Sequence, residues 1–152
     1  MRVAEIMTNA TVTDSHTGTL QAAAEMMWRQ QTGSIVIVEG GELVGIVTER
    51  DVLKAVAEGK DVAKTLVGDV MTTGVITVES DTSIRDAART MAHHWIRHLP
   101  VVDEGVLVGI VSQRDVAGVF AALWRDAGVP EIDTDQLVRA RRLARLEPGD
   151  LD

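Results

Sequence analysis

An internal repeat is the feature that most restricts how this chain of 152 residues can fold. The segment GIVTERDV at residues 45–52 recurs as GIVSQRDV at residues 109–116, 64 positions later. At that offset the two halves align without a gap, and the matched positions are mostly apolar residues and glycines. The repeat therefore predicts two copies of one supersecondary unit, each too small to bury an adequate core alone.

Both copies predict the same order of elements. A short extended segment comes first, ATVTD in one copy and GVITV in the other. A helix follows, with apolar residues at helical spacing, and then a hairpin whose Val- and Ile-rich arms flank a Gly-containing turn. A second helix closes each copy. We therefore expect an α+β fold in which two β-α-β-β-α repeats pack their sheets together with pseudo-twofold symmetry.

The same pattern predicts the organisation of the whole chain. We expect repeat 1, a charged linker, repeat 2 and a C-terminal extension to occupy residues 1–57, 58–66, 67–125 and 126–152. Asp133 and Thr134 are candidate caps for a helix in the extension. That helix would carry the cluster Arg139, Arg141, Arg142 and Arg145, which would be a solvated face or would cover a partner.

Composition narrows the classes of function. Hydrophobic residues make up 45% of the chain and aromatic residues 3%, so aliphatic side chains must fill the core. The absence of cysteine excludes disulfides, thiolate metal sites and cysteine nucleophiles. A net charge of −8 disfavours nucleic acid as a partner. No apolar run approaches the ~18 residues of a membrane helix, and the start lacks the apolar core of a signal peptide, so we expect a cytoplasmic protein.

One repeated polar motif has two interpretations. Thr48-x-x-Asp51 and Ser112-x-x-Asp115 each lie where a predicted strand leads into a helix. This pattern is typical of helix capping. The same groups suit a nucleotide, because a carboxylate accepts hydrogen bonds from the two hydroxyls of a ribose and a helix start attracts phosphate. From spacing alone both interpretations stay open, and one motif can serve both.

The order of elements and the repeated GIV-T/S-x-R-D-V motif resemble the cystathionine-β-synthase (CBS) domain pair, also called a Bateman module. The segments EIMT and DVMT and the stretch RHLPVVD fit that family too, and the resemblance covers residues 3–124. It implies a stand-alone, non-catalytic regulatory module that binds AMP, ADP, ATP or S-adenosylmethionine in clefts between the repeats. It also implies a homodimer that acts on a protein target the sequence does not identify.

The resemblance further implies two unequal sites. The stronger one would use Thr48 and Asp51 for hydroxyl and ribose, Arg97 and His98 for phosphate, and Val75 and Ile76 for the base. The weaker one would use Ser112, Asp115, Thr11 and Val12. Gly33 and Ser34 stand where the second copy has its basic pair, so the weaker site is expected to hold a phosphate poorly.

Two other classes of function compete with a ligand-binding regulatory module: an enzyme and a protein–protein signalling module. An enzyme is disfavoured, since His94-x-x-x-His98 lacks a continuous helix and a neighbouring glutamate for a metal site, and no nucleophile elbow occurs. The more serious alternative is a protein–protein signalling module with empty clefts. In that case Trp28 and Trp95 would lie on a dimer surface.

Overall fold

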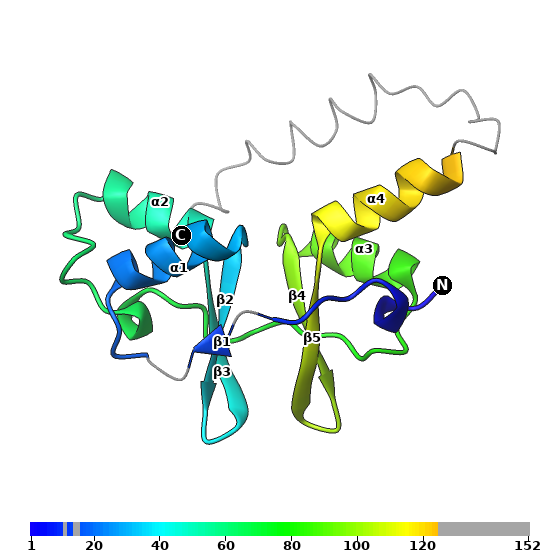
Figure 1. The fold of residues 1–152 in the computed structure, drawn as a ribbon, viewed down its shortest axis with the longest axis horizontal. Helices are drawn as coiled ribbons and strands as arrows, with labels where there is room; N and C mark the ends of the chain where they lie inside the picture. Colours follow the sequence, from blue (N-terminus) through cyan, green and yellow to red (C-terminus); the bar gives the residue numbers. More distant parts are fainter. Residues whose placement is uncertain (11, 14–15, 125–152) are drawn as a thin grey trace. The chain divides into compact units, whose positions relative to one another are not determined.

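The computed structural model describes residues 1–10, 12–13 and 16–124, and it contains the expected helices and hairpins (Figure 1). The elements of the first copy are β1 (Val12–Thr13), α1 (Leu20–Gln30), β2 (Ser34–Glu39), β3 (Glu42–Thr48) and α2 (Glu49–Ala57). Those of the second are α3 (Ile84–His93), β4 (His98–Asp103), β5 (Val106–Ser112) and α4 (Gln113–Trp124). Two 3-10 helices, η1 (Val3–Glu5) and η2 (Val67–Asp69), precede them. The predicted α+β repeat is confirmed.

The strands form two small sheets. β2 and β3 pair antiparallel, and β1 adds to β2 in parallel. β4 and β5 form the matching antiparallel hairpin, in a register that repeats that of β2 and β3. The strand expected over residues 74–78 is reduced to one bridge, between Val78 and Val101. The two hairpins contact each other through β3 and β5.

Local sequence explains where these elements begin and turn. The Thr19 hydroxyl accepts a hydrogen bond from the Ala22 amide at 3.2 Å and caps α1, and the Ser83 hydroxyl does the same for α3 from the Asp86 amide at 3.1 Å. The β2–β3 turn needs two successive residues with positive φ, and Gly40 and Gly41 supply them at 59° and 90°.

The core around the first sheet is aliphatic, as the composition predicts. Its buried residues come from α1, β2, β3, α2 and η2: Leu20, Ala23, Met27, Ile35, Ile37, Val47, Ala55 and Val67. Val67 belongs to the second copy in the sequence, yet it is 2% exposed in this first core. A residue from the start of the second copy therefore packs in the core of the first copy.

Two segments are exchanged between the copies, the N-terminal arm (residues 1–8) and the middle arm (residues 65–72). The N-terminal arm pairs with the second copy: the Val3 amide donates to the Thr82 carbonyl at 2.9 Å, and Thr8 forms an antiparallel bridge with Ile110. The middle arm pairs with the first copy in the same way, through a bridge between Thr72 and Ile46. Each structural half therefore takes its opening segment from the other copy.

Two glycines let the arms approach the sheets. A Cβ on Gly45 would lie 2.5 Å from the Met71 sulfur, and a Cβ on Gly109 would lie 2.9 Å from the Met7 sulfur. Both distances are too short for a side chain, so the glycine of each GIV motif is required by the arm that crosses it. The two halves are thus interlocked at equivalent positions.

The chain divides into two compact units, Met1–Gly118 and Val119–Asp152. All features of the site described below lie in the first unit. Of the second, the structure describes only the last residues of α4, so the predicted C-terminal helix and its arginines lie outside the described residues. In the described ranges no helix is both long enough and apolar enough to cross a bilayer.

Candidate functional site

A cavity of about 200 Å³ lies where the first copy's β3 leads into α2, against two segments of the second copy, residues 72–76 and 95–98. Its wall includes all six residues that the family resemblance assigns to the stronger site: Thr48, Asp51, Val75, Ile76, Arg97 and His98. Residues from both copies therefore meet around one space. We call it the first cavity.

The Thr48–Asp51 motif caps α2 and lines the first cavity at the same time. The Thr48 amide and hydroxyl both donate to Asp51 Oδ2, at 2.7 and 2.8 Å. Within the described residues no hydrogen bond involves Oδ1. The carboxylate is therefore fixed by one oxygen, and its other oxygen can accept hydrogen bonds from a ligand in the cavity. The two interpretations of the motif are compatible.

A second and larger cavity, about 1040 Å³, lies at the start of α4 and is lined by Ser112 and Asp115. The capping box is complete here, as it is at Thr48 and Asp51. The Ser112 amide and hydroxyl donate to Asp115 Oδ2 at 2.8 and 2.6 Å, and the Asp115 amide donates back to the Ser112 hydroxyl at 3.3 Å. Thr11 lies outside the described residues. Val12 is described only as a backbone partner of Val36 in the sheet.

Basic side chains reach the second cavity, although the positions that match the basic pair supply none. Gly33 and Ser34 do line it, but so do Arg97, Arg114 and His98. The residue pair Arg97 and His98 belongs to the walls of both cavities. The family resemblance assigned this pair to one site only. The sequence does not show that the two sites adjoin.

Arg97 is already paired in this arrangement. Its Nη2 donates to Glu49 Oε1 at 2.7 Å, across the two copies. The side chains of Arg97 and Glu49 are 41% and 57% exposed. An ion pair this open to water contributes little to stability and can exchange its partners. Arg97 is therefore available to an anion that competes with Glu49.

His98 lies between the two cavities. A Cβ on Gly33 would be 3.1 and 3.2 Å from the Cε1 and Nε2 atoms of its ring, so the ring packs against the main chain of the first copy. Burial lowers the pKa of His98 below its ordinary value, and the positive charge of Arg97 lowers it further; Glu49 and Asp115 act in the opposite direction. The lowered pKa favours the neutral form of His98 near pH 7, in which one ring nitrogen can donate and the other can accept a hydrogen bond.

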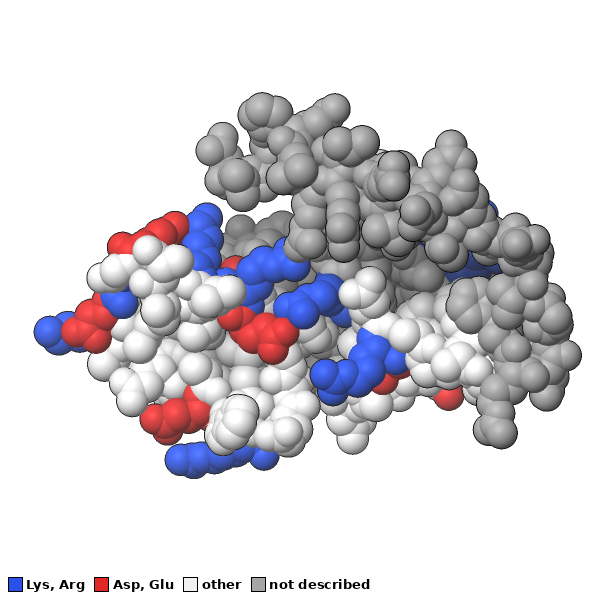
Figure 2. All heavy atoms as spheres, turned by 90° about the horizontal axis from the view of Figure 1, so that it is seen from above, with Lys and Arg blue, Asp and Glu red and all other residues white. Residues whose placement is uncertain are grey.

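The surface near the cavities carries both signs of charge, although the chain as a whole is acidic. Figure 2, which views the helical end, shows basic side chains gathered beside acidic ones in the part formed by described residues. In the first cavity Arg50 and Arg97 face one carboxylate, Asp51. Arg50 and, once it exchanges Glu49 for the ligand, Arg97 can therefore serve an anionic ligand despite the net charge of −8.

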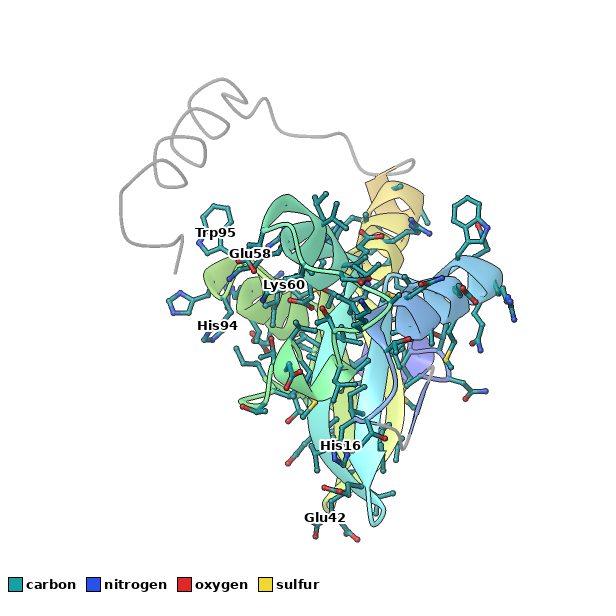
Figure 3. The ribbon with its side chains drawn as sticks, turned by 90° about the vertical axis from the view of Figure 1, so that its left-hand side faces the viewer. His16, Glu42, Glu58, Lys60, His94 and Trp95 are labelled. Atoms are coloured by element: carbon teal, nitrogen blue, oxygen red, sulfur yellow. The ribbon has the colours of Figure 1, made fainter. Side chains whose placement is uncertain are left out.

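Sequence reasoning missed several residues of the first cavity. They are Ile46, Thr72, Gly74, Trp95 and Ile96, together with Arg50, whose direction the sequence left open. Trp95 has a positive φ of 56° just after α3, and its carbonyl accepts a hydrogen bond from Arg50 at 3.4 Å. Figure 3 shows it beside His94 at the end of this helix. The repeated Met-Thr pair of the arms was a usable signal for Thr72.

His94 and His98 do not share a helix. His94 is the C-cap of α3, and His98 is the first residue of β4. The i,i+4 geometry that a metal pair needs is therefore missing at these two positions.

Comparison with known proteins agrees with this arrangement. A family model for the CBS domain matches residues 3–58 and 67–122. The CBS domain-containing protein YhcV of Bacillus subtilis is 41% identical over 116 residues, which cover 76% of this chain and 82% of YhcV.

Two solved structures carry ligands. The CBS domain pair of protein MJ0100, in complex with 5′-methylthioadenosine and S-adenosyl-L-methionine, superposes with a TM-score of 0.75 at 29% identity. The match covers 81% of this chain and 98% of that one. The CBS domain protein PAE2072 of Pyrobaculum aerophilum, complexed with AMP, gives a TM-score of 0.70 at 29% identity and covers 80% and 99%.

Proposed function

This chain belongs to the CBS domain family and contains two copies of the domain, and on that premise we propose that it is a regulatory module that senses an adenosine-containing ligand. The candidates are AMP, ADP and ATP, with S-adenosylmethionine as a further one. The observation that carries the proposal is the first cavity, where Thr48, Asp51 and Arg97 lie together with apolar side chains that include Val75 and Ile76. The ligands of MJ0100 and PAE2072 support the adenosyl group as the common feature.

Each wall of the first cavity suits one part of such a ligand. Asp51 Oδ1 would accept from the ribose hydroxyls. Val75 and Ile76 would cover the base with apolar surface. Arg97, with its planar fork of donors, and Arg50 would hold phosphate oxygens. The cavity is smaller than the ~300–1,000 Å³ typical of drug-sized ligands, so the base and ribose would be enclosed and the phosphates would lie at its mouth.

Sensing would follow from the position of the cavity between the copies. A ligand that contacts Asp51 from the first copy and Val75 and Arg97 from the second stabilises the arrangement in which these residues are close. It can shift the packing of the two halves only as far as it binds one arrangement better than another. The regulated protein would read that shift.

Isothermal titration with AMP, ATP and S-adenosylmethionine tests the proposal. Asp51→Asn keeps an oxygen that can accept the Thr48 capping bonds and removes the charge. Because charge-assisted hydrogen bonds contribute about 1.5–3 kcal/mol, we expect its affinity to fall roughly tenfold or more. The matched variant Asp115→Asn should lower the affinity less. Equal losses would contradict the inequality of the sites, and no heat from any ligand would favour a protein–protein signalling module instead.

We also propose that the chain acts as a cytoplasmic homodimer. α2 carries two large apolar side chains on its outer side, Leu53 at 69% and Val56 at 56% exposure. Exposed apolar residues on one helix favour an interface, since their burial against a second copy removes apolar area from water. A dimer would let each ligand-dependent shift act on two copies at once.

A further inference from the structure

Glu49 breaks the symmetry of the repeat at the point where the cavities adjoin. In the aligned motifs GIVTERDV and GIVSQRDV, Glu49 corresponds to Gln113, and its partner Arg97 corresponds to Gly33. The ion pair at 2.7 Å therefore has no equivalent at the matching positions. One carboxylate and one guanidinium, each present in one copy alone, meet between the two copies.

The position of this pair makes it relevant to both cavities. Arg97 lines the first and the second cavity, whereas Glu49 lines the second. The first cavity has two arginines against one carboxylate, and the second has Arg97 and Arg114 against Glu49 and Asp115. The second cavity therefore has equal numbers of positive and negative side chains because Glu49 lines it, whereas the first has one more positive side chain than negative.

The main chain on both sides of the pair is fixed, so only the side chains need to move. The Glu49 amide donates to the Gly33 carbonyl at 3.1 Å, and the Arg97 carbonyl accepts from the Gln113 amide at 2.8 Å. Both side chains reach solvent. Arg97 can therefore leave Glu49 for another anion by a change of rotamer, without a rearrangement of the strands or helices.

We propose that Glu49 determines the charge preference of the ligand by acting as a built-in anion that occupies Arg97. A phosphate group must displace the Glu49 carboxylate to gain Arg97, whereas an uncharged or cationic adenosyl ligand leaves the pair intact. Glu49 therefore selects against phosphate-rich ligands and makes S-adenosylmethionine and adenosine better competitors of ATP. The inference rests on the proposed function and adds the residue that sets ligand selectivity.

The test compares ATP with adenosine on the full chain by isothermal titration. Glu49→Gln should bind ATP about three- to tenfold more tightly than the wild type, because an exposed ion pair no longer has to be broken and one like charge is removed. Adenosine has no phosphate, so its affinity should change by less than about twofold. The selectivity ratio between the two ligands is the readout.

Two further variants separate the pair from general charge effects. Glu42→Gln changes the net charge equally, but Glu42 lies at the tip of the β2–β3 hairpin, at the opposite end from the helices (Figure 3). It should leave both affinities unchanged. In an Arg97→Gln background, the gain from Glu49→Gln should shrink to less than about twofold, because the arginine that it releases is missing.

The outcomes distinguish a failure of the inference about Glu49 from a failure of the proposed function. A gain for ATP that depends on Arg97 supports the inference. A gain that Glu42→Gln reproduces, or that persists without Arg97, overturns it and leaves the proposed function standing. Unchanged ATP affinity in Glu49→Gln overturns it as well. If neither ATP nor adenosine binds the wild type or Glu49→Gln, this inference fails, and the proposed function fails as well if AMP and S-adenosylmethionine also give no heat.

Discussion

Replacing Gly109 by alanine tests whether the exchanged arms hold the two halves together. A Cβ at this position would lie 2.9 Å from the Met7 sulfur and 3.0 Å from the Thr8 carbonyl oxygen. Thr8 is bridged to Ile110 and lines the second cavity. The carbonyl therefore cannot move away without breaking that bridge, and the new methyl group should push the N-terminal arm off β5.

The contacts give the size of the effect. Adding a methyl group to a tightly packed site costs about 1–3 kcal/mol. For a folded unit of this size, the entropy of unfolding converts 1 kcal/mol into a shift in Tm of about 4 °C. We therefore expect Gly109→Ala to lower Tm by roughly 4–12 °C. Gly118→Ala is the matched control: among the described residues, no atom outside its own stretch of helix lies within 4 Å of the added Cβ, and alanine is the better helix former, so Tm should stay or rise.

Thermal unfolding by circular dichroism, at one fixed protein concentration, measures these shifts. Gly45→Ala provides an internal comparison, since its nearest obstacle is the end of the flexible Met71 side chain at 2.5 Å. Met71→Ala should therefore rescue Gly45→Ala more completely than Met7→Ala rescues Gly109→Ala, because the backbone oxygen that remains is 3.3 Å away in the first case (Thr72) and 3.0 Å in the second (Thr8). If Gly109→Ala is as stable as the wild type, the close crossing of arm and sheet is not a constraint and the reasoning is refuted.

Three further predictions follow from single residues. The pKa of His98 is lowered in the folded state, so the fold is most stable where this histidine is neutral, above pH ~6.5, and loses stability as the pH falls and the ring is protonated. The Tm should therefore drop more between pH 7.5 and pH 5.5 in the wild type than in His98→Gln. Leu53→Asp should convert a dimer to a monomer in size-exclusion chromatography with light scattering, whereas Val106→Asp, at an exposed hairpin position, should not. Ser34 is 1% exposed and its hydroxyl has no hydrogen-bond partner among the described residues, so Ser34→Ala should leave the denaturant midpoint unchanged or raise it, and a lower midpoint would reveal a partner.

Most of the fold could be predicted because its signals are local. The periodicity of apolar residues and the capping residues Thr19 and Ser83 mark the elements in each copy independently, and the repeat allows one copy to check the other. The residues of the first cavity were assigned from the family resemblance, since spacing alone left helix capping and ligand binding open. Its polar residues lie within a few positions of strand ends, and the two repeats face each other at those ends.

The exchange of the arms could not be predicted from the repeat. The segments that end in Met7-Thr8 and Met71-Thr72 are so alike that either one satisfies the contacts of either sheet. An offset of 64 therefore fits an exchanged and a non-exchanged fold equally well. Only the distances decide, such as that between the Met71 sulfur and the position of a Cβ on Gly45.

The pairing of Arg97 was missed for a different reason. Alignment of the copies places Arg97 opposite Gly33 and says nothing of Glu49, which lies 48 positions away in the sequence. Alignment compares equivalent positions, whereas this contact joins positions that are not equivalent. Alignment of the repeats therefore cannot predict contacts between the two halves of a pseudo-symmetric fold.

The exchanged arms also have a consequence for synthesis on the ribosome. The N-terminal arm leaves the ribosome well before its partners: Arg2 donates to the Asp81 carbonyl, 79 positions further along the chain. The first half can close once Thr72 has been made, while residues 1–8 wait with Val3 exposed until β5 is complete. During that interval the unpaired arm can dock on a neighbouring chain, so crowded polysomes would favour interlinked dimers over monomers.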